Sequence, residues 1–305
     1  MSSDGTGMRH SALVYESQND YVARAVSFLR EGLDAGEGAV VGNTRPGLAA
    51  VREALGPDAS RVTFIDVGAA YTRPARTFAA YHKVYADEFK RAASVRVISD
   101  VQFGPEPGEW EMWTGYEALM NRAFAHLPTW AMCTYNANAL PDRVLEGVWQ
   151  THPEVVAGNV WRASDQFEDP ADLLRRITPA PEPLPELRSI SVGQHDSETL
   201  REALARELVA EGVTEAKSLD MLIAVSEIAA NAAVHGGGVK GMRVGRTRGR
   251  FVCEIIDWGS GFDDPTAGYL PPRDGVGRGL WVARQLTWRI EFSHPPQGFT
   301  ARLWL

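Results

Sequence analysis

One stretch decides the fold of the C-terminal half of this chain: SLDMLIAVSEIAANAAVH, residues 218–235. It is apolar at nearly every position around a helix, which predicts a helix that is largely buried. The polar exceptions Asp220, Glu227, Asn231 and His235 are spaced by seven, four and four residues, so they share one stripe of that helix. The helix alone leaves two interpretations open. These side chains form capping or core hydrogen bonds, or Glu227 and Asn231 line a cleft with oxygen ligands suited to Mg²⁺ and its waters.

The segment IIDWGSGF, residues 255–262, adds a carboxylate at the end of a predicted strand. Asp257 could accept a hydrogen bond from an exocyclic amine such as that of adenine. Gly259 and Gly261 would let the backbone approach a ring closely, because neither carries a Cβ atom. Taken alone, an aspartate-rich turn after a strand is common, so this segment gains meaning only from its neighbours.

A glycine-rich loop follows, GVGRGL at residues 275–280, and it precedes a predicted helix. Gly275, Gly277 and Gly279 would expose backbone N–H groups at the positive end of the helix dipole, which is a ready phosphate site. A flexible loop explains the glycines equally well, and the absence of a following Lys-Ser/Thr pair excludes a Walker-type loop. Thr300, at the start of the last predicted strand, offers a hydroxyl group.

In this order the four segments resemble the Bergerat-type ATP site of the GHKL superfamily, which includes gyrase, Hsp90, histidine kinase and MutL types. Within that superfamily, AVSEIAANAAVHG at residues 224–236 is similar to the anti-sigma-factor serine/threonine kinases. The segments GRGL (277–280), IEF (290–292) and GFT (298–300) also fit that branch. The resemblance covers about 110 residues and implies an α+β ATP-binding sandwich with ATP and Mg²⁺ as cofactors.

The resemblance also implies roles for single residues. Glu227 is then the general base that activates a protein serine or threonine hydroxyl, and Asn231 coordinates Mg²⁺. An arginine of the lid, Arg273 or Arg278, would stabilise charge on the transferred phosphoryl group, and of these Arg278 is the candidate catalytic residue. The implied nucleotide-binding residues are Asn231, Asp257 for adenine, Gly259, Gly261, the phosphate-loop residues Gly275, Gly277, Gly279 and Leu280, and Thr300.

Two other functions stay open. The first is a non-catalytic ATP-binding module that sequesters a sigma factor, although the intact Glu227 and Asn231 argue against it. The second is a histidine-kinase-like sensor, which would carry its phosphoacceptor histidine on a two-helix hairpin ahead of the ATP domain. Here a predicted strand at residues 188–192 and a predicted helix at 198–211 follow directly, with His195 in the turn between them. No hairpin fits in that space.

The composition is that of an ordinary soluble globular protein: 305 residues, 44% hydrophobic and 23% charged, a length that predicts two domains. A net charge of −8 argues against direct nucleic-acid binding. Apolar runs are too short for a membrane span, and the first ten residues lack a signal-peptide core, so we expect a cytoplasmic protein. Two cysteines, Cys133 and Cys253, are too few for a disulfide framework or a thiolate zinc site.

The chain divides at TPAPEPLPE, residues 178–186. Alternating prolines fix φ and favour an extended, semi-rigid spacer. The predicted domains are therefore residues 1–177 and 187–305, joined by a proline-rich linker at 178–186. In the second domain, helices at 198–211 and 215–235 precede strands at 241–247, 250–257, 289–293 and 300–305, a pattern typical of an α+β layer sandwich.

The first domain alternates short strand-like runs with amphipathic helical stretches. Predicted strands lie at residues 11–15, 38–42, 61–66, 95–99 and 130–135, with helices such as 21–33 and 115–125 between them. This order predicts an α/β fold with a mostly parallel sheet covered on both faces. No phosphate-binding glycine loop follows the first strand, so the fold lacks the parts for a nucleotide.

Four segments of this domain look like the MEDS sensory domain, a RecA-like α/β module: RHSALVY (9–15), FLREGL (28–33), YEALMN (116–121) and CTYNANAL (133–140). The resemblance implies signal reception, with a small apolar or aromatic molecule as the signal. Trp110, Trp113, Tyr116 and Trp130 would line its pocket or form the core.

Two further features of the first domain carry alternatives. His10 would be a ligand-binding or switch residue, or a satisfied surface histidine. Glu117 and Asn121 repeat the Glu–Asn spacing of the second domain, but no adenine or lid motif follows, so we interpret the pair as coincidence or local structure.

Together these observations predict a cytoplasmic signalling regulator. A sensory domain would control an ATP-dependent protein serine/threonine kinase that acts as an anti-sigma factor in a partner-switching pathway. The expected partners are a sigma factor, an antagonist protein and a small-molecule signal, with no direct contact to nucleic acid or membrane. A homodimer formed through the ATP domain is expected from the family alone.

Overall fold

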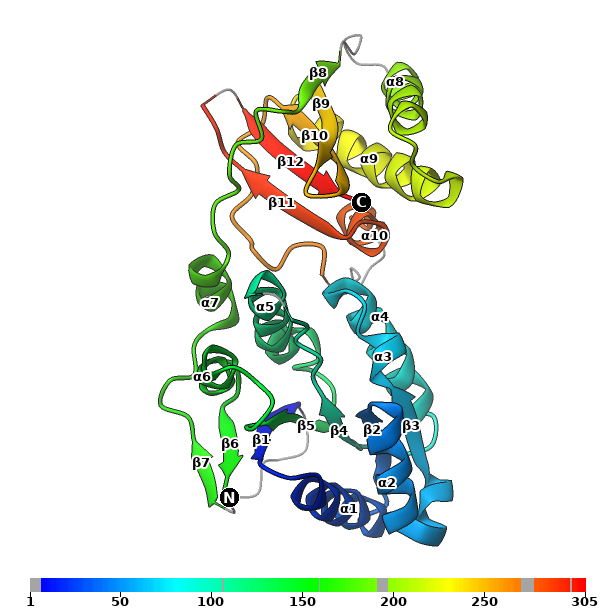
Figure 1. Cartoon of the computed structure of the whole chain (residues 1–305), viewed down its shortest axis with the longest axis vertical. Helices are drawn as coiled ribbons and strands as arrows, with labels where there is room; N and C mark the ends of the chain where they lie inside the picture. Colours follow the sequence, from blue (N-terminus) through cyan, green and yellow to red (C-terminus); the bar gives the residue numbers. More distant parts are fainter. Residues whose placement is uncertain (1–6, 106, 159, 191–196, 270–276, 297) are drawn as a thin grey trace. The chain divides into compact units, whose positions relative to one another are not determined.

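The computed structural model describes residues 7–105, 107–158, 160–190, 197–269, 277–296 and 298–305. The chain divides into two compact units, Met1–Thr178 and Pro179–Leu305 (Figure 1). Each unit has its own sheet and its own hydrophobic core.

Unit 1 is built on a seven-stranded sheet with the order β3-β2-β4-β5-β1-β6-β7. All neighbouring pairs are parallel except β6–β7, which confirms the predicted mostly parallel α/β sheet. The strands are β1 (Arg9–Tyr15), β2 (Gly38–Asn43), β3 (Val62–Asp66), β4 (Val95–Asp100), β5 (Thr129–Asn136), β6 (Glu154–Ala157) and β7 (Val160–Ala163). The inner strands are short apolar runs buried on both faces, as parallel sheets require.

Helices cover both faces of this sheet. Leu13 and Met132 point to the face where α1 (Gln18–Asp34) and α2 (Arg45–Leu55) complete the core. His10 and Ser99 point to the other face, where they contact α5 (Pro107–Ala123) and α4 (Pro74–Glu88), respectively. The remaining elements are η1 (Gly56–Arg61), α3 (Val67–Ala70), α6 (Asp142–Thr151) and α7 (Pro170–Ile177).

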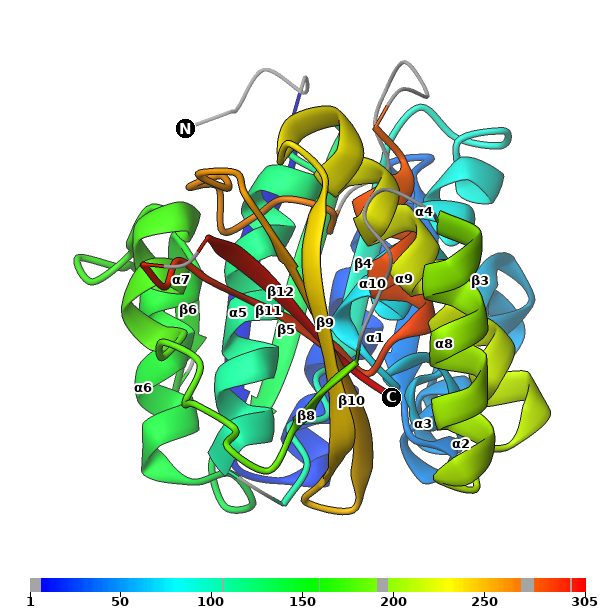
Figure 2. The ribbon, with the colours of Figure 1, turned by 90° about the horizontal axis from the view of Figure 1, so that it is seen from above.

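Unit 2 is a two-layer sandwich. Its antiparallel sheet has the order β11-β12-β10-β9-β8, and the helices α8, α9 and α10 lie together on one face of it (Figure 2). The elements are β8 (Arg188–Ile190), α8 (Ser197–Ala210), α9 (Glu215–His235), β9 (Val239–Thr247), β10 (Arg250–Asp257), α10 (Gly279–Leu286), β11 (Arg289–Ser293) and β12 (Phe299–Trp304). This arrangement confirms the predicted α+β architecture of the C-terminal half.

Helix α9 is less buried than its composition predicted. Met221, Val225 and Ile228 face the sheet and are buried, whereas Leu219 and Val234 are 58% and 74% exposed. The reason is the two-layer architecture: the sheet and the flanking helices cover one side of α9, and the described residues supply no third layer. An exposed apolar stripe therefore runs along the outer side of α9.

The proline-rich segment does not stand free of unit 2. Leu184 and Leu187 are buried against Val252 and Trp304 on the sheet face opposite the helices. The Arg243 guanidinium donates hydrogen bonds to the carbonyl oxygens of both leucines, at 2.8 and 3.1 Å. The sequence predicted a spacer at residues 178–186, and the structure shows that the end of this segment covers a sheet face.

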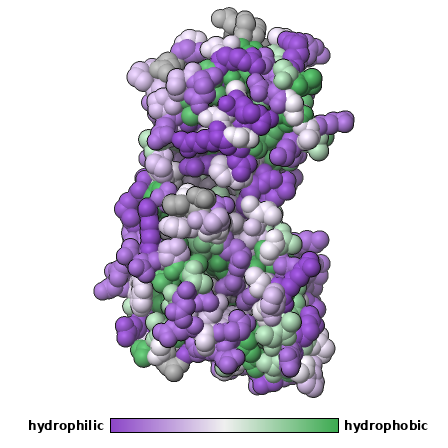
Figure 3. All heavy atoms as spheres, viewed as in Figure 1, coloured by the Kyte–Doolittle hydropathy of each residue, from purple (hydrophilic) through white to green (hydrophobic). Residues whose placement is uncertain are grey.

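The surface agrees with the charged composition. The face seen in Figure 3 carries mostly hydrophilic residues, with hydrophobic residues in separate groups. Within the described part of the chain, no helix combines the length and the apolar character needed to cross a membrane.

Candidate functional site

Glu227 and Asn231 lie one turn apart on α9, and both face the first residue of α10. A Cβ atom on that residue, Gly279, would lie 2.7 Å from Glu227 Oε2 and 3.4 Å from Asn231 Oδ1. The backbone can approach these side chains so closely only because Gly279 has no side chain. Both polar residues are half-buried, so they line the seam between α9 and α10 without being sealed inside it. The structure thus joins the helix motif to the end of the glycine-rich loop.

Asp257 ends β10 with its side chain 8% exposed. Its Oδ1 atom accepts a hydrogen bond of 2.7 Å from the backbone N–H of Gly259. Gly236, which caps the C-terminus of α9, lies against the carboxylate, and a Cβ there would be 2.6 Å from Asp257 Oδ2. Burial raises the pKa of Asp257, and the Gly259 N–H partly offsets that effect. The carboxylate is therefore held in place at the end of the same helix that carries Glu227.

Two other predicted glycines, Gly261 and Gly277, follow Asp257 and precede Gly279, respectively. Gly261 has φ +69°, and the ring of Phe299 fills the space that a side chain there would need. Gly277 has φ +74° and is exposed, as is Arg278, which occupies the N-cap position of α10 without a side-chain capping hydrogen bond. Leu280 packs against the core of unit 2. The predicted residues Gly275 and Arg273, and His195 of the histidine-kinase alternative, lie outside the described residues.

Thr300 does not join this set. In the β10–β12 register Phe299 lies opposite Asp257, and Thr300 lies opposite Ile256. Because successive side chains of a strand point to opposite faces, Thr300 faces away from the helices, on the sheet side of Arg302 and Glu254. The sequence placed Thr300 among the nucleotide ligands, and the register separates it from them.

A groove of about 440 Å³ lies beside the Asp257 turn. Glu227, Asn231 and Asp257 are absent from its lining, so it is distinct from the seam between α9 and α10. The residues that line the groove are Lys240, Trp258, Gly259, Ser260, His294, Pro295, Pro296, Gly298 and Phe299.

In unit 1 the predicted aromatic pocket is not one cluster. Trp113 and Tyr116 are buried and contact each other and Tyr71, with ring centroids 5.1–5.8 Å apart. Trp130 packs edge-on against Phe28 of α1, on the opposite face of the sheet. These aromatic side chains therefore belong to two separate parts of the core.

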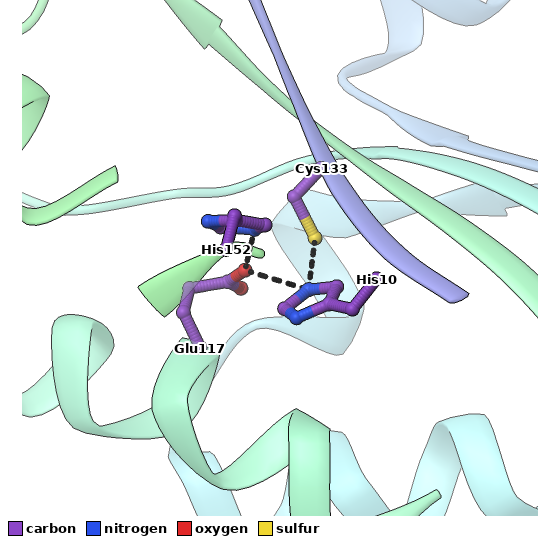
Figure 4. A group of neighbouring side chains, drawn as sticks. All are labelled: His10, Glu117, Cys133 and His152. Carbon is purple, nitrogen blue, oxygen red and sulfur yellow. Dashed lines mark hydrogen bonds and ion pairs between the residues drawn. The ribbon is translucent and has the colours of Figure 1, made fainter. Parts of the chain in front are cut away.

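Sequence reasoning missed a buried polar group in unit 1. His10, Glu117, Cys133 and His152 converge between the sheet and helices α5 and α6, each at most 4% exposed (Figure 4). His10 is therefore not a surface histidine, and Glu117 is not incidental. The available signal was the position of His10 and Cys133 on two predicted inner strands, but only the strand order shows that β1 and β5 are neighbours.

Two family models match the chain. Residues 9–153 match MEDS, the MEthanogen/methylotroph, DcmR Sensory domain, and residues 194–304 match the Histidine kinase-like ATPase domain. No curated protein is significantly similar to the chain. The second match contains Glu227, Asn231, Asp257 and Gly279, and the first contains the four buried polar residues of unit 1. The chain therefore carries an N-terminal MEDS domain followed by a C-terminal histidine kinase-like ATPase domain.

Proposed function

We propose that the C-terminal domain is an ATP-dependent protein serine/threonine kinase that acts as an anti-sigma factor, under the control of the MEDS domain. The observation that carries this proposal is the close approach of Gly279 to Glu227 and Asn231. It puts a carboxylate, an amide and the N-terminus of α10 at one place, and these groups suit a base, a metal-bound phosphate and a phosphate oxygen.

The chain's own residues divide the work of this reaction. Asp257, fixed by Gly259 and Gly236, would bind the exocyclic amine of adenine. Glu227 would accept the proton of a partner's serine or threonine hydroxyl as that oxygen bonds to the γ-phosphorus and ADP leaves. Arg278, exposed at the start of α10, would stabilise the charge of the transferred phosphoryl group.

The residues present fit ATP and Mg²⁺. The Glu227 carboxylate and the Asn231 amide both lie beside the first residue of α10, so oxygen ligands suited to Mg²⁺ stand next to a helix N-terminus suited to phosphate. Asn231 would hold Mg²⁺, which when bound neutralises charge on the phosphates. Phosphate contacts would come from the backbone N–H groups that begin α10 and from arginine, because no lysine stands between residues 241 and 305.

Two substitutions test the proposal on the full chain. Asp257→Asn should abolish ATP binding, because the amide oxygen would accept from Gly259 N–H and leave the NH₂ group, a donor, facing the adenine amine. Glu227→Gln should retain ATP binding and lose phosphate transfer to a partner. Isothermal titration with ATP and Mg²⁺ measures the first effect, and labelled ATP with candidate antagonist proteins measures the second. Asp220→Asn is a matched control, since Asp220 lies on the same stripe of α9 as Glu227 but about 10 Å from it along the helix axis.

The outcomes separate the alternatives. Unchanged ATP affinity in Asp257→Asn would remove the basis of the proposal. ATP binding without any transfer, together with a stable sigma-factor complex, would support the sequestering module instead. Label on the protein's own histidine would support the histidine-kinase alternative. That alternative needs a helical hairpin before the ATPase domain, and the described residues between α7 and β8 form no helix.

We also propose that the ATPase domain forms a homodimer through the outer side of α9. Leu219, Ile223 and Val234 are spaced by four and eleven residues, so they share one side of the helix, and all three are exposed. A second copy of the same helix would remove this apolar surface from water. Leu219→Glu should shift the chain toward monomer in analytical ultracentrifugation and leave ATP binding intact, because Leu219 lies about 12 Å before Glu227 along α9. An unchanged sedimentation coefficient would place the interface elsewhere.

A further inference from the structure

Four potential metal ligands come together in the interior of the MEDS domain (Figure 4). His10 comes from β1, Cys133 from β5, Glu117 from the middle of α5, and His152 follows the last residue of α6. One ligand atom from each residue lies within 4.8 Å of all the others. The side chains of His10, Glu117 and His152 are at most 2% exposed.

Hydrogen bonds behind the two histidines orient both rings. His152 Nδ1 lies 3.0 Å from the carbonyl oxygen of Val148, which can only accept, and 2.9 Å from Thr151 Oγ1, whose proton can go to the Gly147 carbonyl. A proton on Nδ1 satisfies both contacts. The Asn121 amide nitrogen donates to the carbonyl oxygen of Thr151 at 2.8 Å, so its oxygen is left to accept from His10 Nδ1 at 3.1 Å. Each Nε2 atom therefore presents a lone pair to the other ligands, the arrangement found behind metal-bound histidines.

On the side of the cluster away from these hydrogen bonds, acceptor atoms of Glu117 and the histidines face one another. Both carboxylate oxygens of Glu117 and Nε2 of His152 are buried without a hydrogen-bond partner. The Cys133 thiol, 3.4 Å from His10 Nε2, and the Tyr135 hydroxyl beside Glu117 are donors near these atoms. Two protons cannot satisfy the two carboxylate oxygens and both Nε2 atoms together. Such buried acceptors are costly unless a cation lies among them.

We propose that His10, Glu117, Cys133 and His152 bind a divalent transition-metal ion, with zinc as the best fit. Tetrahedral zinc with bonds of 2.0–2.3 Å places neighbouring ligand atoms about 3.3–3.7 Å apart. Three pairs already lie close to that spacing: His10 Nε2 to Cys133 Sγ at 3.4 Å, His10 Nε2 to Glu117 Oε2 at 3.5 Å, and His152 Nε2 to Glu117 Oε2 at 3.2 Å.

The charges also balance. Zn²⁺ binding displaces the thiol proton of Cys133 to solvent, so one thiolate and one carboxylate neutralise the ion in a fully buried place. Four protein ligands leave no coordination position for substrate, which is typical of a structural or regulatory zinc site and not of a hydrolytic one. This site is independent of the kinase proposed for the other domain.

The first experiment uses the unmodified full chain. Plasma mass spectrometry of the purified protein should find one zinc ion per chain. After removal of the metal, Co²⁺ should produce a thiolate charge-transfer band and the visible bands of tetrahedral coordination, and added Zn²⁺ should displace it. Zn²⁺ should also raise the midpoint of thermal unfolding of the metal-free chain. A chain that is isolated without metal, and that shows neither the cobalt bands nor a thermal shift, would overturn the proposal and identify a metal-free Glu–His cluster.

Substitutions then assign the ligands. Cys133→Ser should abolish the charge-transfer band, whereas Cys253→Ser, a fully buried cysteine in the apolar core of unit 2, should leave it unchanged. Asn121→Ala removes the hydrogen bond that orients His10 and the one to the Thr151 carbonyl beside His152, but no ligand atom. It should weaken cobalt affinity about 10–100-fold while the bands persist. Circular dichroism and a cooperative thermal transition show whether each variant is folded. Retention of the band in folded Cys133→Ser would contradict the assignment.

Discussion

Asp100 ends β4 inside unit 1 and is held by two hydrogen bonds. Its carboxylate accepts from Thr134 Oγ1 at 3.2 Å and from Gln102 Nε2 at 2.9 Å. Burial is the largest effect on this group, and it raises the pKa of Asp100 to about 6, with the two hydrogen bonds acting in the opposite direction. A carboxyl group whose pKa is higher in the folded state binds more protons when folded, so its contribution to stability falls as the pH rises from about 4 to 6.

We therefore expect Asp100→Asn to stabilise the chain at pH 8 by up to about 3 kcal/mol, because the amide carries no charge to desolvate. The gain should shrink as the pH falls below 6 and disappear near pH 4. Urea unfolding at several pH values measures it, with Asp165→Asn, an exposed residue, as the control. A gain that does not depend on pH would show that the Asp100 charge is already compensated.

The absence of a side chain at Gly279 is a second effect of a single residue. Gly279→Ala would place a Cβ atom 2.7 Å from Glu227 Oε2, and it would do so at the first position of α10, where alanine suits the helix itself. We expect weaker ATP binding with little loss of stability. Gly241→Ala is a control, since that glycine lies in β9 with no atom near its Cβ position and without a positive φ. Equal ATP affinity in both variants would place the nucleotide away from Gly279.

At the scale of the element, β10 carries different chemistry on its two faces. Its helix-facing side ends in Asp257, and the other side carries Glu254, which is 2% exposed. Glu254 pairs with Arg302 on β12 at 2.8 Å and with Arg243 on β9 at 2.9 Å. One buried carboxylate thus connects three neighbouring strands.

Removal of that carboxylate leaves two arginines without their shared partner. We expect Glu254→Gln to lower the free energy of unfolding by about 3–5 kcal/mol, the range for breaking a buried ion pair. Glu182→Gln is the matched control, because its pair with Arg248 is 78% and 69% exposed and should contribute less than about 1 kcal/mol. Chemical denaturation compares the two variants. A similar loss in both would mean that the buried network adds nothing to the sheet.

Elements with a strong local pattern could be predicted from the sequence. The helix expected at residues 215–235 is α9 with the same bounds, and the strand expected at 250–257 is β10. Strand β7 was missed because all four of its residues are exposed and show no alternation. The outward orientation of Thr300 depends on the β10–β12 register, which a single strand's sequence does not contain.

The two sites also differ in how far the sequence could predict them. The ATPase residues lie in ordered motifs within one domain, so each motif could be predicted before the structure joined Glu227 to Gly279. The cluster of unit 1 has no motif: its ligands are single residues on β1, α5 and β5 and beyond α6, and only the parallel pairing of β1 with β5 brings them together. Two cysteines are too few for a thiolate zinc site, but in this group one cysteine joins two histidines and a glutamate.

At the scale of the whole molecule, the stability of unit 2 depends on where the chain is divided between the two units. The fragment 179–305 keeps Leu184 and Leu187 on the sheet, whereas a fragment that begins at residue 188 loses both. We expect the longer fragment to fold and bind ATP, and the shorter one to be less stable by about 3–5 kcal/mol, the value of two buried leucine side chains. Urea midpoints of the two fragments test this. Equal midpoints would show that the segment is only a spacer.

The pairing of β1 with β5 also determines when unit 1 can become complete. Arg9 lies opposite Trp130, and the last ligand of the proposed metal site is residue 152, near the middle of the chain. In unit 2, by contrast, β9 and β10 are joined by the two-residue turn Arg248-Gly249, a local contact that closes early. Because His152 is residue 152 of 305, a ribosome must release about half of the chain before the four ligands can meet. Contacts between residues so far apart in sequence also form slowly. Metal capture would then mark the end of MEDS-domain folding during synthesis.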